Sequence, residues 1–207
     1  MEILRITYGH TTIPEKVVFS GGDKNKELPI ALSVFLIKTG NRTILVDAGC
    51  EDLPGFELTD FQPATAALKE QGIATDDITD VIITHAHHDH AQCVRDYPNV
   101  RVWVQEQEYA RKPHYFANNP NITTFRETAM VAEGIRAVKI GGHTTGSCVV
   151  ECENDGKVYV LCGDECYSRY NLEHKVPTAS SKNPENSKSF IEKYTGQPYI
   201  CLLCHDA

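Results

Sequence analysis

The sequence predicts an α/β protein built as a sandwich of two mixed β-sheets flanked by helices. Short β-branched runs alternate along the chain with short helical segments, and two of the runs form a hairpin. Hairpins combined with strand–helix alternation favour a sandwich over a barrel. The 207 residues contain no repeat, linker or low-complexity segment, so we expect residues 1–207 to fold as a single domain with a substantial core.

The strands are predicted from apolar runs bounded by polar residues. In chain order they cover residues 1–6, 32–37, 43–46, 80–83, 100–104, 135–140, 158–162 and 199–204, and Cys148 and Cys152 fall within a further strand-like run. Polar residues 39–42 separate the second and third runs, which therefore read as a hairpin. The run 100–104 alternates between apolar and polar residues, whereas 80–83 is β-branched throughout its apolar part and reads as a buried strand.

Three helices are predicted between these strands. The first covers 63–70, because a proline stands near its start and Gly72 follows its end. The second covers 106–111, directly after the alternating strand. The third covers 184–194 and precedes the last strand.

The most informative stretch is 84–90, with the sequence Thr-His-Ala-His-His-Asp-His, directly after the buried strand 80–83. His85, His87, Asp89 and His90 stand at positions i, i+2, i+4 and i+5 of this stretch. Imidazole and carboxylate groups are typical metal ligands, and so dense a set indicates a metal site. A loop at the end of a strand has a rigid base, where such a site can be pre-organised.

Further ligand-type residues follow the last three predicted strands. His143, Asp164 and His205 each stand just after one of them, so four strands deliver ligands to one edge of the molecule. Seven ligands exceed the needs of one tetrahedral zinc ion and suit two ions that share a carboxylate. We expect the first ion on His85, His87 and His143, and the second on Asp89, His90 and His205, with Asp164 bridging both.

This pattern resembles the metallo-β-lactamase superfamily, and the resemblance spans nearly the whole chain. It is carried by the HxHxDH element at 85–90 and by the later His, Asp and His in the family's order. Asp47, in the sequence Val-Asp-Ala-Gly, matches a structural aspartate beneath the metal loop of the family. The resemblance implies an αββα sandwich with a dinuclear site at one edge of the two sheets.

Residues around Asp164 resemble the N-acyl homoserine lactonase branch of that superfamily. The hydrolytic β-lactamases typically carry a cysteine at this position, while glyoxalase II-like and lactonase-like enzymes carry aspartate. Glyoxalase II enzymes have a C-terminal helical extension, whereas only two residues follow His205 here. Tyr167 stands three residues after Asp164 and resembles a tyrosine that faces the substrate carbonyl in the lactonases, although it could equally be an aromatic packed under a loop.

The chain also departs from the lactonase branch. Ala91 and Gln92 replace a glycine-containing continuation of the metal motif, and threonine stands at 144–145 where proline is common. These differences concern the acyl homoserine lactone substrate more than the hydrolytic chemistry. The loops 50–62 and 111–125 carry aromatic residues that either grip a substrate or form a small core beneath the loops.

The resemblance implies a metal-dependent hydrolase of lactonase or esterase type acting on a small-molecule lactone or ester. Two divalent ions about 3.5–4 Å apart hold a bridging hydroxide at neutral pH, which would attack the carbonyl. Tyr167 would donate a hydrogen bond to the developing oxyanion, and Asp89 or Asp164 would protonate the leaving alkoxide. Imidazole ligands make zinc the first choice of metal, and the mixed ligand set also accepts iron, manganese or cobalt. An acyl homoserine lactone substrate would imply quorum quenching.

Composition limits the partners and the location. A formal net charge of −8 and the absence of a Lys/Arg run argue against a nucleic-acid substrate. No apolar stretch approaches the roughly 18 residues that span a membrane, and residues 1–6 do not begin an export signal. We therefore expect a cytoplasmic monomer or homodimer whose eight cysteines are reduced and mostly buried.

Two other functions stay open from the sequence. The same superfamily contains mononuclear iron thiol or persulfide dioxygenases, which would use His85, His143 and Asp164 around one iron. A non-catalytic binding module stabilised by its metal is the other. Cys201 and Cys204-His205 also match a c-type haem attachment pattern, but that reading requires export and leaves no other role for the histidine.

Overall fold

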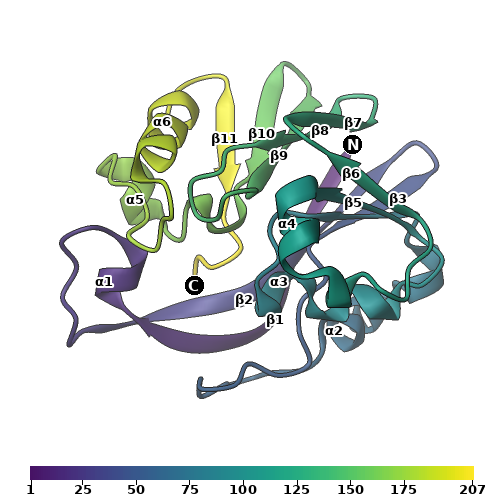
Figure 1. Ribbon diagram of the computed structural model, residues 1–207, viewed down its shortest axis with the longest axis horizontal. Coiled ribbons are helices and arrows are strands. Elements are labelled where there is room, and N and C mark those ends of the chain that lie inside the picture. Colours follow the sequence, from purple (N-terminus) through teal and green to yellow (C-terminus); the bar gives the residue numbers. More distant parts are fainter.

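The computed structural model describes residues 1–207 as two mixed β-sheets packed face to face, with helices on both outer faces (Figure 1). The N-terminal sheet contains, in spatial order, β1 (Glu2–Pro14), β2 (Glu27–Thr39), β3 (Arg42–Val46), β4 (Asp80–Ile83), β5 (Arg101–Gln105) and β6 (Ile122–Phe125). The C-terminal sheet contains, also in spatial order, β11 (Tyr199–Leu202), β10 (Lys157–Leu161), β9 (Cys148–Asn154), β8 (Ile135–Lys139) and β7 (Thr128–Ala132).

Each sheet combines antiparallel hairpins with parallel pairs. Strands β1, β2 and β3 form an antiparallel meander, and β3 to β6 are parallel. In the other sheet β7 to β10 are antiparallel and β11 lies parallel to β10. Parallel neighbours need crossover connections, which the helices supply. As a result β4, β8, β10 and β11 carry their C-terminal ends to one edge of the sandwich.

The helices are short apart from the last. They are α1 (Glu15–Val18), α2 (Ala64–Glu70), α3 (His88–Ala91), α4 (Glu106–Arg111), α5 (Arg169–Glu173) and α6 (Pro184–Tyr194). Single 3₁₀ turns occur at η1 (Thr75–Asp77), η2 (Gln92–Asp96), η3 (Pro113–Tyr115) and η4 (Gly163–Glu165). Helix α6 starts where the Asn183 side chain accepts a hydrogen bond from the Asn186 backbone N–H, with proline in its first turn. None of the helices is both long enough and apolar enough to cross a lipid bilayer.

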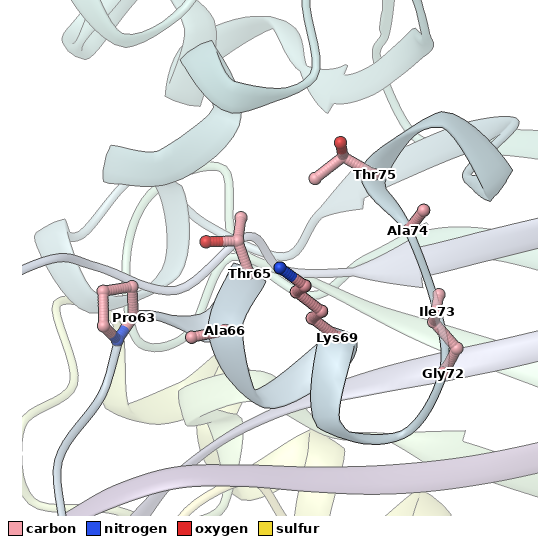
Figure 2. Close-up of a pocket in the computed structure, with 8 residues that line it drawn as sticks. All are labelled: Pro63, Thr65, Ala66, Lys69, Gly72, Ile73, Ala74 and Thr75. Carbon is pink, nitrogen blue, oxygen red and sulfur yellow. The ribbon is translucent and has the colours of Figure 1, made fainter.

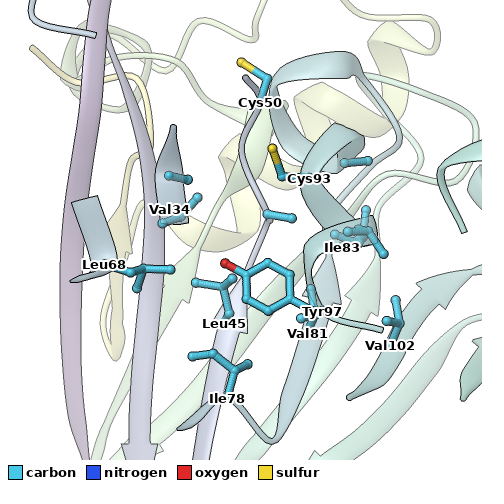
Figure 3. Packing of buried hydrophobic residues seen from close by; sticks show 14 of the residues in the cluster. Val34, Leu45, Cys50, Leu68, Ile78, Val81, Ile83, Cys93, Tyr97 and Val102 are labelled. Carbon is cyan, nitrogen blue, oxygen red and sulfur yellow. The ribbon is translucent and has the colours of Figure 1, made fainter. Parts of the chain in front are cut away.

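The core lies in three layers because the central strands are buried on both faces. Along β2, Val34 and Leu36 face the helices outside the N-terminal sheet, whereas Phe35 and Ile37 alternate toward the C-terminal sheet. Figure 3 shows the outer layer of this sheet, where Leu68 of α2 lies near the strand residues. Outside the C-terminal sheet, Phe190, Ile191 and Tyr194 of α6 form the third layer. The predicted αββα sandwich is thereby confirmed.

Most predicted elements are present, and the differences have local causes. The hairpin of β2 and β3, strand β4 and helices α4 and α6 lie where the sequence predicts them. Strand β1 continues to Pro14 instead of stopping at residue 6, because a bulge near Thr7 lets the mixed segment that follows keep pairing with β2. Strands β6 and β7 were not predicted, since both are short edge strands without a clear apolar pattern. All eight cysteines are free thiols, and seven of them are buried.

Candidate metal centre

The structure brings the seven predicted ligand side chains together at the edge where the four strands end. His85 and His87 lie on the loop between β4 and α3, and His90 lies within α3. His143 follows β8, Asp164 lies in η4 after β10, and His205 follows β11. The side chains form two groups on either side of Asp164. That these groups bind metal stays a prediction from the sequence, and the geometry below supports it.

The first group consists of His85, His87, His143 and one oxygen of Asp164. Nδ1 of His87 lies 2.9 Å from Nε2 of His85 and 2.9 Å from Nε2 of His143. Asp164 Oδ2 lies 3.6 Å from the first of these Nε2 atoms and 3.4 Å from the second. Ligand atoms around a tetrahedral zinc ion lie about 3.3 Å apart. The four donor atoms therefore have the spacing of a single coordination sphere.

The second group consists of His90, His205 and the other oxygen of Asp164. Asp164 Oδ1 lies 3.0 Å from Nε2 of His90 and 3.0 Å from Nε2 of His205. Asp89 Oδ2 stands a little further out, 3.5 Å and 3.8 Å from the same two nitrogens. Nε2 of His90 is buried and makes no hydrogen bond, in spite of its short separation from Asp164. An unpartnered buried nitrogen that faces two carboxylates fits a cation between them.

The opposite ring nitrogens are held by the protein. Nδ1 of His90 lies 2.8 Å from Asp47 Oδ2, and Nδ1 of His205 lies 2.8 Å from the carbonyl oxygen of Ala31. Asp47 Oδ1 also accepts the backbone N–H of Thr84 at 2.8 Å. Such contacts fix ring orientation and leave the inner nitrogen free as a ligand. Asp47 thus lies beneath the metal loop, as the sequence predicts, in the left-handed conformation that aspartate tolerates (φ 63°).

A buried glutamate ties two of the ligand loops together. One oxygen of Glu108 accepts the backbone N–H of Ala86 at 2.8 Å and the Arg111 guanidinium at 3.0 Å. Its other oxygen accepts the hydroxyl of Thr144 at 2.6 Å and the N–H of Gly146 at 3.1 Å. Ala86 stands between two predicted ligands of the first loop, and Thr144 follows the ligand of the second. The carboxylate therefore fixes the two loops relative to each other.

A second buried carboxylate supports the His143 loop from behind. Glu165 Oε1 accepts the backbone N–H groups of Gly142 and His143, each at 3.1 Å, and the hydroxyl of Ser147. Burial raises the pKa of Glu165 to about 7. Because Glu165 accepts the hydrogen bonds of this loop, both oxygens of its neighbour Asp164 can face the two histidine groups.

Burial and charge set the protonation of the two groups differently. In the first group burial, together with the neighbouring imidazoles, lowers the pKa of His85 well below its usual value and that of His87 to about 4. Both rings are therefore neutral, which is the form that binds metal. In the second group burial alone would lower the pKa of His90, but Asp164, Asp89 and Asp47 outweigh it and raise the pKa. That excess of negative charge favours a cation at the second group.

A cavity of about 160 Å³ opens onto these groups. Its polar wall holds His87, Asp89, Asp164, Tyr167 and His205, and its apolar wall holds Ile13, Val17, Ile30, Leu53 and Phe56. The loop 50–62 therefore shapes the cavity with two side chains, while Leu58 and Phe61 of the same loop pack on the core. The loop 111–125 contributes no lining residue, and its Phe116 belongs to the core. His88 points away from the ligand groups toward Tyr115 and Asp52.

A larger hollow on the surface lies elsewhere and carries none of the predicted site residues. It measures about 590 Å³ and lies between α2 and η1 (Figure 2). Lys69 is its one charged lining residue. The predicted ligands His87, Asp89, Asp164 and His205 line the smaller cavity instead.

Comparison with known families agrees with this geometry. The family model described as the metallo-beta-lactamase superfamily matches residues 29–188. The chain belongs to the metallo-β-lactamase superfamily. Among its relatives, N-acyl homoserine lactonase AiiB of Agrobacterium fabrum is 26% identical over 70% of this chain and 66% of its own length. The N-acyl homoserine lactonase of Bacillus thuringiensis is 26% identical over 91% of this chain and 84% of its own length.

Solved structures of this superfamily share the fold of the chain. An N-acyl homoserine lactone hydrolase with the product N-hexanoyl-L-homoserine bound at its catalytic metal centre superposes with a TM-score of 0.86. That match covers 99% of this chain and 92% of the other, at 22% sequence identity. The superposition shows that the two chains share one fold.

Sequence reasoning missed several residues around the candidate metal centre. Glu108 and Glu165 gave no signal, because their acceptor role depends on backbone N–H groups from distant loops. Ile13 and Val17 reach the cavity from β1 and α1, a segment in which no element was predicted beyond residue 6. Cys204 directly precedes the last predicted ligand, but in the sequence it matched only a haem attachment pattern.

Proposed function

We propose that this chain is a dinuclear metal-dependent hydrolase that opens a lactone or ester, with an N-acyl homoserine lactone as the substrate. The observation that carries the proposal is the position of Asp164, whose two oxygens face separate histidine groups at 3.0 to 3.6 Å. Relatives named N-acyl homoserine lactonase at 26% identity support the substrate class. The apolar wall of the cavity suits an acyl group, and its polar wall suits the ester.

The proposed metal-binding roles follow the two groups. His85, His87 and His143 hold the first ion, and Asp89, His90 and His205 hold the second, with Asp164 shared between them. When bound, two divalent ions, proposed to be zinc, supply a nucleophile derived from water at neutral pH and polarise the carbonyl. The neutral imidazoles of the first group and the negative charge of the second suit this arrangement.

Tyr167 is proposed to bind the reacting oxygen of the substrate. Its ring stacks on His205 with centroids 5.1 Å apart, and its hydroxyl donates to Asp164 Oδ2 at 2.8 Å. Burial, with Asp164 beside it, raises the pKa of this phenol well above its usual value, so the hydroxyl stays a donor. A donor at the cavity wall next to the shared carboxylate can stabilise negative charge that develops on the carbonyl oxygen.

Asp89 is proposed to accept the proton that the attacking water loses and to donate it to the leaving alkoxide. It lines the cavity and keeps 19% of its side chain exposed, whereas Asp164 is 4% exposed. Both oxygens of Asp164 also face histidine nitrogens. Asp89 is therefore the carboxylate that can reach both substrate and solvent.

The test is metal analysis of protein purified without added metal, together with turnover of a panel of lactones. We expect about two divalent ions per chain and lactone opening that is lost in His87→Ala. Tyr167→Phe should retain both ions and lower kcat by roughly 10²-fold, the range seen when one oxyanion donor is removed. His88→Ala is the matched control, since His88 lies in the same loop but faces away from both groups.

One iron per chain with no opening of any lactone would contradict the proposal and favour thiol oxidation. Two bound ions without turnover of any lactone or ester would contradict the hydrolytic function but would still support the dinuclear metal centre. An unchanged kcat in Tyr167→Phe would remove the tyrosine from the mechanism.

A further inference from the structure

Cys204 lies against the second histidine group and is not among the side chains that line the cavity. It follows β11, directly before His205, and is buried with 1% of its surface exposed. Its Sγ lies 3.9 Å from Asp164 Oδ1. The thiol and one donor atom each of His90, Asp164 and His205 all lie within 4.8 Å of one another. These four side chains could therefore share one ion.

A buried cysteine is by default a small apolar side chain. Cys148, Cys152 and Cys204 all belong to the core layer between the sheets. Of these three, Cys204 is the one whose sulfur also lies near a carboxylate and two imidazoles. Zinc–sulfur bonds of about 2.3 Å and zinc–oxygen bonds of about 2.0 Å place the two ligand atoms about 3.5 Å apart. The observed 3.9 Å is within a small adjustment of that value.

An independent observation points to a cation at this place. Nε2 of His90 is buried and makes no hydrogen bond, although it lies 3.0 Å from Asp164 Oδ1. A nitrogen in this state has a lone pair or a proton without a partner, which costs free energy unless an ion binds it. Asp89 can supply one more ligand, but it lies on the cavity side at 3.5 Å. Cys204 is a donor that does not line the cavity.

We propose that Cys204 is a thiolate ligand of the second metal ion, an inference that rests on the dinuclear centre proposed above. The thiol releases its proton to the buffer when the ion binds. A sulfur ligand makes this position selective for zinc or cobalt over manganese, because thiolates prefer softer cations and manganese prefers oxygen. Asp89, at the cavity wall, would then be the carboxylate available to move a proton.

The experiment is a titration of the metal-free full chain with Co²⁺, followed by absorption spectroscopy. Cobalt bound to imidazole and carboxylate gives weak visible bands, and a thiolate ligand adds an intense sulfur-to-cobalt charge-transfer band in the near ultraviolet. We expect two cobalt ions per chain and this ultraviolet band in the wild type. In Cys204→Ala and Cys204→Ser the ultraviolet band should be lost, and the second ion should bind at least about tenfold more weakly.

Cys201→Ala is the matched control. Cys201 lies on β11, three residues earlier, and its Sγ contacts the Tyr194 carbonyl oxygen at 3.5 Å instead of the ligand group. This variant should keep both the band and the affinity. Competition with Mn²⁺ provides a second readout, since Cys204→Ser should discriminate less between cobalt and manganese than the wild type does.

The outcomes separate the two proposals. Two bound cobalt ions without a sulfur band in the wild type would overturn the role of Cys204 and leave the dinuclear centre standing. A band that persists in both Cys204 variants would also overturn it. Failure of the wild type to bind a second cobalt ion would overturn the dinuclear centre and this inference with it. The wild-type spectrum decides the question even if the variants fold poorly.

Discussion

Replacing Glu108 by glutamine tests whether this carboxylate fixes the positions of the two ligand loops relative to each other. The carboxylate accepts hydrogen bonds from Ala86, Thr144 and Gly146 while it is itself fully buried. Glutamine has one acceptor oxygen and an NH₂ group in place of the second. If its oxygen stays with Thr144 and Gly146, its NH₂ faces the backbone N–H of Ala86, and that N–H has no acceptor.

The expected loss of stability follows from that arrangement. A buried N–H without an acceptor costs about 1–3 kcal/mol, and a lost hydrogen bond to a charged group costs a similar amount. Glu108→Gln should therefore lower the free energy of unfolding by about 2–4 kcal/mol. Because Ala86 lies between His85 and His87, we also expect metal affinity to fall by about 10- to 100-fold.

Two measurements and one control check this prediction. Urea unfolding of the metal-free chain gives the change in stability, and competition with a chromophoric chelator gives the change in metal affinity. Glu106→Gln on the same helix is the control, because Glu106 pairs with Arg126 at the exposed surface. That control should change stability by less than about 0.5 kcal/mol. If Glu108→Gln behaves like it in both measurements, the carboxylate does not position the loops.

Two further predictions concern Asp80, the first residue of β4, and Gly163, which follows β10. The Asp80 carboxylate accepts from Arg42 and from the Trp103 indole; burial alone would raise its pKa, but these bonds outweigh it and lower the pKa. The folded pKa of Asp80 lies below the unfolded value of about 3.9. The free energy of unfolding lost in Asp80→Asn should therefore be constant above about pH 5 and shrink as the pH falls through the folded pKa. Unfolding measured from pH 6 to pH 3 checks this, and a loss that stayed constant over that range would contradict it. Gly163 has φ +51° and an added Cβ would lie 2.8 Å from Thr84 Oγ1, so Gly163→Ala should cost about 2–4 kcal/mol. Gly156→Ala, at φ +73° with open space around it, should cost only about 1 kcal/mol, and equal losses in thermal unfolding would contradict the role of the clash.

The sequence allowed prediction of the elements whose ends are marked by local chemistry. Helix α6 begins at Pro184, directly after the N-cap residue Asn183, and β4 is a β-branched run that ends at polar residues, so both were located to the residue. The spacing of His85, His87, Asp89 and His90 also predicted a shared site, and the structure places these side chains together around Asp164. Local pattern was sufficient because each feature depends on residues a few positions apart.

Features that depend on distant segments could not be predicted. The carboxylate of Glu108 resembles an ordinary helix glutamate in the sequence, and only the approach of the loop after β8 gives it buried N–H partners. Cys204 similarly becomes a candidate ligand only because the fold brings it next to Asp164, forty residues earlier. The apolar wall from β1 and α1 escaped prediction because its residues are few and widely spaced.

Because each sheet is formed by one half of the chain, metal bound at the candidate centre would link the docking of the two halves to metal binding. Residues 2–125 form one sheet and residues 128–202 form the other, so each sheet is built from a continuous half of the chain. The HxHxDH loop belongs to the first half, and His143, Asp164 and His205 belong to the second. Ions held between them would act as non-covalent cross-links that exist only when the halves are docked. Ligand present at one hundred times its dissociation constant adds about 2.7 kcal/mol to the state that binds it. Metal supply would then govern how tightly the halves of the molecule are joined, in addition to governing its chemistry.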